Sequence, residues 1–240
     1  MIKFLLVLFM CLIGAAKANT IELVVAASAG GPDDVLSRRI VEKIEQNSDL
    51  KIVISNKPGA AHTIGYNYVQ QRVKPTMIVS TSSIADHEVY KELTDVYQLG
   101  SFQNIVFVSS SSGIKNINAL VSLSKLRQIN FGYGGTGTHS HKAMLRLCEG
   151  TLSCLPVPYK SGANAMLDML VGSIDAYALV SYGSDGFLKN DKYTPIYRIT
   201  NDTNWVRLFS KNMSEQDITT VRKVLKGLGP EFFSELGLIK

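Results

Sequence analysis

The stretch 130–141, NFGYGGTGTHSH, follows an apolar run that predicts a strand and leads into a helical pattern over residues 140–149. Its glycines, Gly132, Gly134 and Gly137, form a G-x-G-x-x-G at this strand-to-helix turn. Such a turn is typical of a dinucleotide site, and it exposes backbone N–H groups at the positive end of a helix, where anions bind. The stretch therefore predicts a βα unit with an anion-binding loop.

A second glycine loop lies nearer the start of the chain, at residues 29–34, AGGPDD. It also follows a predicted strand and begins a helix, with Pro32 where a first helical turn tolerates a missing N–H. Either loop alone could be only a tight turn. Two such loops in separate βα units favour an anion that is bound between them.

The dinucleotide hypothesis requires an acid about 20 residues past the glycines, at the end of the next strand. That strand ends in VPYK at residues 157–160, without an acid. A metal site at His139 and His141 is disfavoured, because the two rings would diverge on a helix and His141 is expected to pack at the base of the loop. No G-x-S-x-G hydrolase motif is present. We therefore expect no catalytic residue, metal or cofactor.

Apolar periodicity along the chain alternates between strand and helix patterns. Strands are predicted over residues 21–28, 51–55, 76–80, 105–108, 129–131, 155–157, 174–180 and 194–199. Helices are predicted over residues 34–46, 62–72, 118–126, 140–149, 163–171, 214–228 and 230–238. Because alternating strands and helices form parallel sheets with covered faces, the predicted fold class is α/β.

The first residues have the pattern of a secretory signal peptide. Lys3 precedes an apolar run over residues 4–13, and the small residues Ala16 and Ala18 suit cleavage after Ala18. The run is shorter than the roughly 20 residues of a membrane-spanning helix, so we expect it to be removed and the protein exported. The formal net charge of +5 is small and no Lys/Arg run occurs, so nucleic acid is not an expected partner.

Two cysteines follow the signal segment, Cys148 and Cys154 in CEGTLSC. In an oxidising compartment this pair favours a disulfide that closes a tight loop between a helix end and the next strand. Two buried thiols are the alternative. Metal binding is disfavoured because the pair lacks the close spacing of zinc ligands.

Four motifs occur in order: AGGPDDVLSRRI at 29–40, NKPGAAHTIG at 56–65, NFGYGGTGTHSHKAM at 130–144 and VPYKSGANAMLDMLVGSIDA at 157–176. Together they resemble the tripartite tricarboxylate transporter substrate-binding family, also called Bug receptors. The resemblance implies a type II-like periplasmic binding protein, with two α/β lobes of parallel or mixed sheets and a ligand cleft between them. Residues 19–103 and the helices within 205–240 would form lobe 1, and residues 104–204 would form lobe 2.

The resemblance also implies which residues hold the ligand, a small di- or tricarboxylate or a related acid. The implied contacts are Ala29, Gly30, Gly31 and Asp34 in the first loop and Gly135, Thr136, Gly137 and Thr138 in the second. Tyr159 and Asp175 match further motifs near the cleft, although Asp175 could be there for structure.

The chain departs from the family pattern at several places. Tyr133 stands where relatives carry a small polar residue, so it could narrow the pocket or contact the ligand through its hydroxyl. The second motif usually has G-G-N where this chain has Ala61, His62 and Thr63, which could place a titratable ring near the cleft. The chain is also shorter than typical members.

The resemblance implies a non-enzymatic, monomeric periplasmic receptor that delivers its ligand to the membrane subunits of a tripartite tricarboxylate transporter. One alternative is a sensory carboxylate-binding module that acts with a signalling partner. Another, from a different class, is a periplasmic hydrolase or metal enzyme that uses His139, His141 and a nearby acid.

Overall fold

The computed structural model describes residues 20–82 and 91–239, except for the side chains of residues 201–203. Their strands form one eight-stranded sheet in the order β2-β1-β3-β8-β4-β7-β5-β6. The expected signal peptide, residues 1–18, lies outside the described residues. No helix of the described ranges combines the length and the apolar content needed to cross a lipid bilayer.

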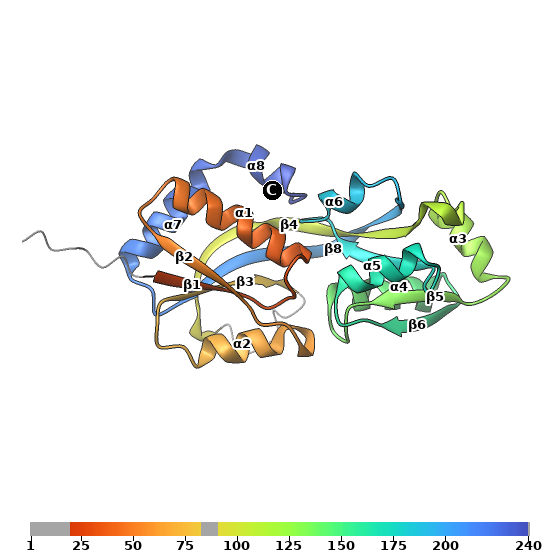
Figure 1. Ribbon diagram of the computed structural model, residues 1–240, viewed down its shortest axis with the longest axis horizontal. Helices are drawn as coiled ribbons and strands as arrows, with labels where there is room; N and C mark the ends of the chain where they lie inside the picture. Colours follow the sequence, from red (N-terminus) through yellow and green to blue (C-terminus); the bar gives the residue numbers. More distant parts are fainter. Residues whose placement is uncertain (1–19, 83–90, 240) are drawn as a thin grey trace, which may run out of the picture.

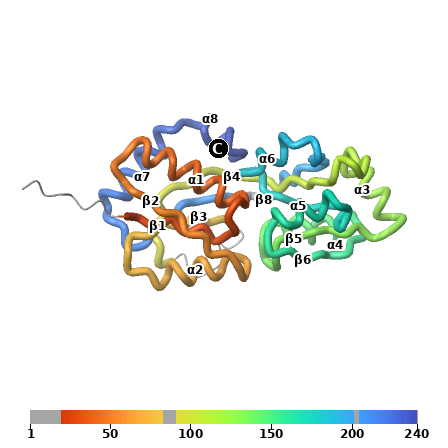
Figure 2. The backbone as a smooth tube through the Cα atoms, in the orientation of Figure 1, coloured from red at the N-terminus to blue at the C-terminus, as the bar shows by residue number. Residues whose placement is uncertain are grey.

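Two lobes joined by two long strands make up the molecule (Figure 1). Lobe 1 holds β1 (Thr20–Val25), α1 (Pro32–Gln46), β2 (Lys51–Asn56), α2 (Thr63–Gln70) and β3 (Thr76–Thr81), with α7 (Glu215–Gly227) and α8 (Gly229–Glu235). Lobe 2 holds α3 (Ile117–Ser124), β5 (Ile129–Tyr133), α4 (His139–Gly150), β6 (Cys154–Pro158), α5 (Gly162–Leu170), β7 (Ala176–Val180) and α6 (Asp185–Leu188). The antiparallel strands β4 (Thr94–Ser109) and β8 (Tyr193–Lys211) run through both lobes, as the tube in Figure 2 also shows.

Each lobe buries both faces of its part of the sheet. Neighbouring β1 residues belong to different cores because side chains alternate across a strand. In lobe 1, Leu36 of α1 and Val221 of α7 share one core, and Val69 of α2 lies in the core of the opposite face. In lobe 2, Met144 of α4 and Met166 of α5 lie in two further cores. Helix α7, near the end of the chain, thus packs beside α1, which is far from it in sequence (Figure 1).

The α/β class is confirmed, with a mixed sheet: β1 is parallel to β2 and β3, β5 is parallel to β6 and β7, and the long strands are antiparallel. The strands predicted over 105–108 and 194–199 are too short, because β4 and β8 continue well beyond them. Register shifts in this pair, at residues 95–97, 98–100 and 102–104, interrupt the two-residue alternation that marks a strand in sequence. The expected lobe boundaries after residues 103 and 204 fall inside these strands and stay a prediction.

The predicted disulfide between Cys148 and Cys154 is present. It joins the last turn of α4 to the first residue of β6. Both cysteines pack against the core that contains Met144 and Leu147. The crosslink therefore fixes the turn between α4 and β6 at the end of the lobe 2 sheet.

The C-terminal segment after α8 binds β4 and the chain that leaves β7. Ile239 forms an antiparallel bridge with Ser101 of β4, through hydrogen bonds of 2.6 and 2.7 Å. The Ser181 hydroxyl donates to the carbonyl oxygen of Gly237 at 2.7 Å, and the Gly183 N–H donates to that of Leu236 at 3.1 Å. The segment 236–239 thus ties β4 to the chain that leaves β7.

Candidate ligand-binding site

A cavity lies between the lobes and is lined by both of them. Lobe 1 contributes residues that follow β1 and β2, and lobe 2 contributes residues that follow β5 and β6 together with part of β7. The cavity measures about 820 Å³, counting all the space between the protein atoms and the part that opens to solvent.

Four helices begin at this cavity. Gly31 and Pro32 begin α1, His62 precedes α2, Thr138 precedes α4 and Ser161 precedes α5, and all five residues line the cavity. The first N–H groups of a helix have no partner inside the helix, and the aligned peptide dipoles make this end positive. The four helix starts make the cavity suited to an anion.

Side chains cap two of these helices and leave further N–H groups at their first turns. The Thr138 hydroxyl accepts from the His141 N–H, and the Ser161 hydroxyl accepts from the Asn164 N–H, both at 3.3 Å. Helix α1 has no side-chain cap, because Gly31 stands at its N-cap. Parallel strands bring these turns together, since their carboxyl ends meet at one edge of a sheet.

The charged groups of the cavity are few. Among its lining residues in the described chain, Lys160 is the one lysine and Asp33 the one carboxylate. The Tyr182 hydroxyl donates to Asp33 Oδ1 at 2.5 Å, and His62 Nε2 lies 3.9 Å from Asp33 Oδ2. Burial, and then the Asp33 charge, hold the pKa of Tyr182 well above its ordinary value, so this hydroxyl stays a donor.

Residues 36–193, more than half of the chain, match the family model described as tripartite tricarboxylate transporter family receptor. The chain belongs to this family. BugT of Bordetella pertussis is 22% identical over 176 residues, which are 66% of this chain and 54% of BugT. The chain spans about half the length of the curated relatives it matches.

Solved structures of Bug and related proteins share the fold. The periplasmic binding protein BugD has a TM-score of 0.78 at 19% identity, over 91% of this chain and 86% of its own. An R. palustris protein with adipate has a TM-score of 0.81 at 18% identity, over 92% and 88%. MatC from Rhodopseudomonas palustris with bound malate has a TM-score of 0.76 at 16% identity, over 92% and 89%. The two-lobe fold expected from the family motifs is therefore confirmed.

In the first glycine loop, Ala29 and Gly31 line the cavity, whereas Gly30 and Asp34 are not among its lining residues. Asp34 is buried and its carboxylate accepts from the Gly30 N–H at 2.9 Å, from Arg38 at 2.8 and 3.1 Å and from Asn56 at 3.0 Å. Burial alone would raise the pKa of Asp34, but these hydrogen bonds hold it below its ordinary value. Asp34 thus holds the loop in place through the Gly30 N–H, and it is not among the residues that line the cavity.

In the second loop, Thr138 lines the cavity, whereas Tyr133, Gly135, Thr136 and Gly137 do not. Gly135 and Gly137 have φ of +101° and +88°, a conformation that favours glycine. The Thr138 hydroxyl lies 2.8 Å from the Gly135 carbonyl oxygen and closes the turn. The loop residues therefore set the turn geometry, and a ligand contact at Tyr133, Gly135, Thr136 or Gly137 stays a prediction.

The two histidines of the H-x-H diverge, as the helical spacing predicts. His139 lines the cavity and packs edge-on against Phe102, with ring centroids 4.7 Å apart. The His141 ring lies 4.8 Å from that of Tyr133, and its Nδ1 accepts from the Gly137 N–H at 3.3 Å. His141 thus packs at the base of the loop. The described residues contain no group of three potential metal ligands.

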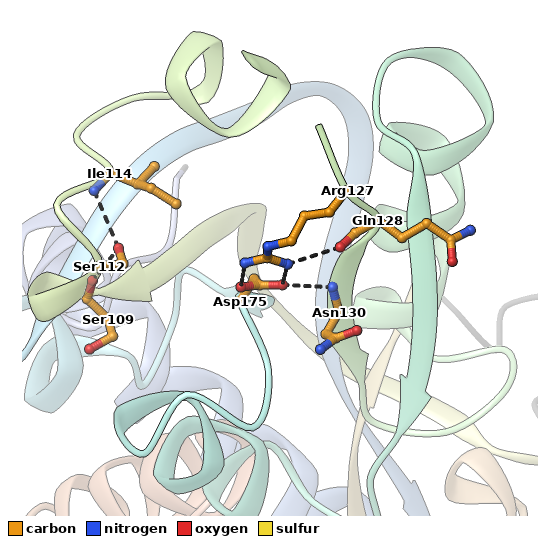
Figure 3. Close-up of polar contacts among 7 residues, drawn as sticks. All are labelled: Ser109, Ser112, Ile114, Arg127, Gln128, Asn130 and Asp175. Carbon is orange, nitrogen blue, oxygen red and sulfur yellow. Dashed lines mark hydrogen bonds and ion pairs between the residues drawn. The ribbon is translucent and has the colours of Figure 1, made fainter. Parts of the chain in front are cut away.

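Tyr159 and Asp175 are not among the lining residues, and both bind protein groups. The Tyr159 hydroxyl donates to Asp168 at 2.8 Å; burial, and then Asp168, raise the pKa of Tyr159 to about 12. Asp175 accepts from Arg127 at 2.6 and 2.8 Å and from the Asn130 N–H at 2.8 Å (Figure 3). Asn130 is near the start of β5, whereas the loop of the cavity follows its end. Asp175 thus links the starts of β5 and β7, at the ends of these strands that lie away from the cavity. Its role as a ligand contact stays a prediction.

Several lining residues are missing from the set that the sequence analysis predicts. They are in particular Asp33, Lys160, Ser161, Gly162, Ala163, Tyr177 and Tyr182. Ser161 follows a predicted strand and precedes a predicted helix, which is an N-cap signal that could have identified α5 as a third helix start. Asp33 lies in the predicted first loop, next to Asp34. Tyr177 and Tyr182 carry no such local signal, because long-range packing brings them to the cavity.

We expect His139 to weaken the fold in mild acid. Burial first, and then the nearby His62 and Lys142, lower the pKa of His139 from 6.5 to about 3. Below pH 6.5, His139 is therefore protonated in the unfolded chain but stays neutral in the folded chain. As the pH decreases, the free energy of unfolding decreases too, by about 2 kcal/mol at pH 5. Urea unfolding measures the free energy of unfolding at pH 7.5 and at pH 5. Its decrease between these two pH values should be about 2 kcal/mol smaller in His139→Gln than in the wild type.

The comparison isolates His139 because every other titrating group is present in both proteins. Asp34 and Asp175, whose pKa values are lowered, lose their stabilising effect only at still lower pH. Equal losses of stability in the two proteins would show that His139 is not held neutral.

Proposed function

We propose that this chain is a periplasmic receptor that binds a small organic carboxylate between its lobes. The observation that carries the proposal is the meeting of four helix starts at one cavity, with Lys160 among the lining residues. Backbone N–H groups at such positions bind carboxylates without a metal or cofactor. The adipate and malate of two structural neighbours are ligands of this class.

The wider role is also a proposal. The signal-like segment 1–18, cleaved after Ala18, would export a freely diffusing monomer to the periplasm. Closure of the lobes on the ligand would create the form that membrane subunits of a tripartite tricarboxylate transporter recognise. Its activity would be binding and delivery, without catalysis and without nucleic acid as a partner.

A thermal-shift screen of mono-, di- and tricarboxylates tests the proposed ligand class. A ligand that binds only the folded state raises the unfolding temperature, by on the order of 5 °C at 100 times its Kd. Neutral amides of the same acids serve as matched controls and should have no effect. If only sugars, amides or cations raise the unfolding temperature, the protein is not a carboxylate receptor.

A further inference from the structure

The loop before α2 has an unusual backbone. Ala60, Ala61 and His62 are consecutive non-glycine residues with φ of +45°, +47° and +76°. Residues other than glycine are disfavoured in this left-handed region, because their Cβ lies too close to the backbone. Strain of this kind persists only where the surrounding structure imposes it, and it clusters at ligand-binding sites. His62 thus carries an imidazole at a place where the backbone favours glycine.

The side chain of His62 lies beside Asp33, and both residues line the cavity. The His62 side chain is 19% exposed. The 3.9 Å between His62 Nε2 and Asp33 Oδ2 is too long for a hydrogen bond. Asp33 itself is held through its other oxygen by Tyr182. The His62 N–H is thus near Asp33 but forms no hydrogen bond with it, so it can donate to a ligand oxygen.

The groups that attract an anion lie on two sides of the cavity. On the lobe 2 side are Lys160 and the starts of α4 and α5. On the lobe 1 side are the starts of α1 and α2 and the ring of His62. A single carboxylate would use one side only, whereas an acid with a carboxylate at each end would bridge both lobes.

We infer that His62 is a specificity-determining residue, which donates a hydrogen bond to the second carboxylate of a dicarboxylate whose first carboxylate binds on the lobe 2 side. This inference rests on the proposed function and names its substrate class. The Asp33 carboxylate offers a competing selectivity, for an acid with a cationic group at its far end. The two selectivities call for different ligands, so one series of compounds separates them.

The test compares acids of equal length by titration calorimetry. The dicarboxylates succinate, glutarate and adipate are paired with butyrate, pentanoate and hexanoate, and with the corresponding ω-amino acids. A hydrogen bond to a charged group contributes about 10- to 100-fold in affinity, so the best dicarboxylate should bind the wild type about 10-fold or more tightly than its monocarboxylate partner. His62→Gly should lose this preference, because its affinity for the dicarboxylate falls by about 10-fold or more.

The variant also separates a ligand contact from a structural role. Glycine accepts the backbone of residue 62, so His62→Gly without ligand should unfold at the same or a higher temperature than the wild type. Ala60→Gly is the matched control: it relieves the same kind of backbone strain at a residue that is not among those lining the cavity, and should leave both affinities unchanged.

Three results would contradict either the role of His62 or the proposed function. A dicarboxylate preference that survives in His62→Gly overturns the inference and leaves the receptor function intact. Tighter binding of an ω-amino acid, lost in Asp33→Asn, also overturns it and assigns the selectivity to Asp33. No binding of any acid in the series to the wild type would count against the proposed function itself.

Discussion

Replacing Ala163 by glutamate is expected to weaken carboxylate binding by on the order of 100-fold or more. Ala163 lines the cavity in the first turn of α5. A glutamate there places a negative charge where the ligand carboxylate is proposed to bind. Two such charges at about 4 Å repel by roughly 4 kcal/mol at the effective dielectric of a protein surface. Titration calorimetry with the acid that gives the largest thermal shift measures the loss.

The fold should tolerate this change. An acidic residue in the first turn of a helix is favourable by about 0.3–1 kcal/mol, so the unliganded variant should be as stable as the wild type. Ala163→Gln is the matched control, because it has nearly the same size and no charge. If the glutamine variant loses as much affinity as the glutamate variant, the effect is steric, and the cavity does not discriminate by charge.

Replacing Gly237 by alanine is expected to destabilise the protein by about 2–5 kcal/mol, from strained backbone and overpacking together. Gly237 has φ of +78°, and an added Cβ would overlap the carbonyl oxygen of Ser181 and lie 2.8 Å from its carbonyl carbon. These are backbone atoms of the residue that follows β7, so they cannot move aside as a flexible side chain would. Urea unfolding measures the change.

Gly172→Ala is the control for Gly237→Ala. Gly172 has the same φ of +78°, but no atom lies within 4 Å of an added Cβ. It should therefore show the backbone cost alone, about 1–2 kcal/mol. The difference between the two variants measures how tightly the segment 236–239 packs on the chain that leaves β7. Equal losses would mean that this segment is not held against Ser181.

The local features of the fold could be predicted from sequence. Each predicted helix is found within a few residues, because apolar periodicity and glycine loops are local signals. The disulfide follows from the spacing of Cys148 and Cys154 in a chain that the sequence predicts to be exported. The lengths of β4 and β8 could not be predicted in this way, since bulges break their alternation and their partners lie about a hundred residues away.

The candidate site was predictable only in part. Ala29, Gly31 and Thr138 line the cavity and belong to the two predicted glycine loops. The other two helix starts at the cavity, those of α2 and α5, depend on how the two lobes pack. Asp33 is adjacent to the predicted Asp34, yet the two side chains point in different directions from α1. Asp34 binds Arg38 and Asn56, whereas Asp33 lines the cavity. Sequence spacing alone does not resolve that difference.

The most direct test of carboxylate binding at the helix starts is an amide NMR titration of the wild type with the best acid from the thermal-shift screen. The N–H signals of Asp33, Ser140 and Gly162, which lie in the first turns of α1, α4 and α5, should shift together and saturate with one ligand per chain. Amides near Asp175, at the far ends of the lobe 2 strands, should stay in place. Saturable shifts confined to other parts of the chain, or no shifts with any carboxylate, would contradict the proposed site.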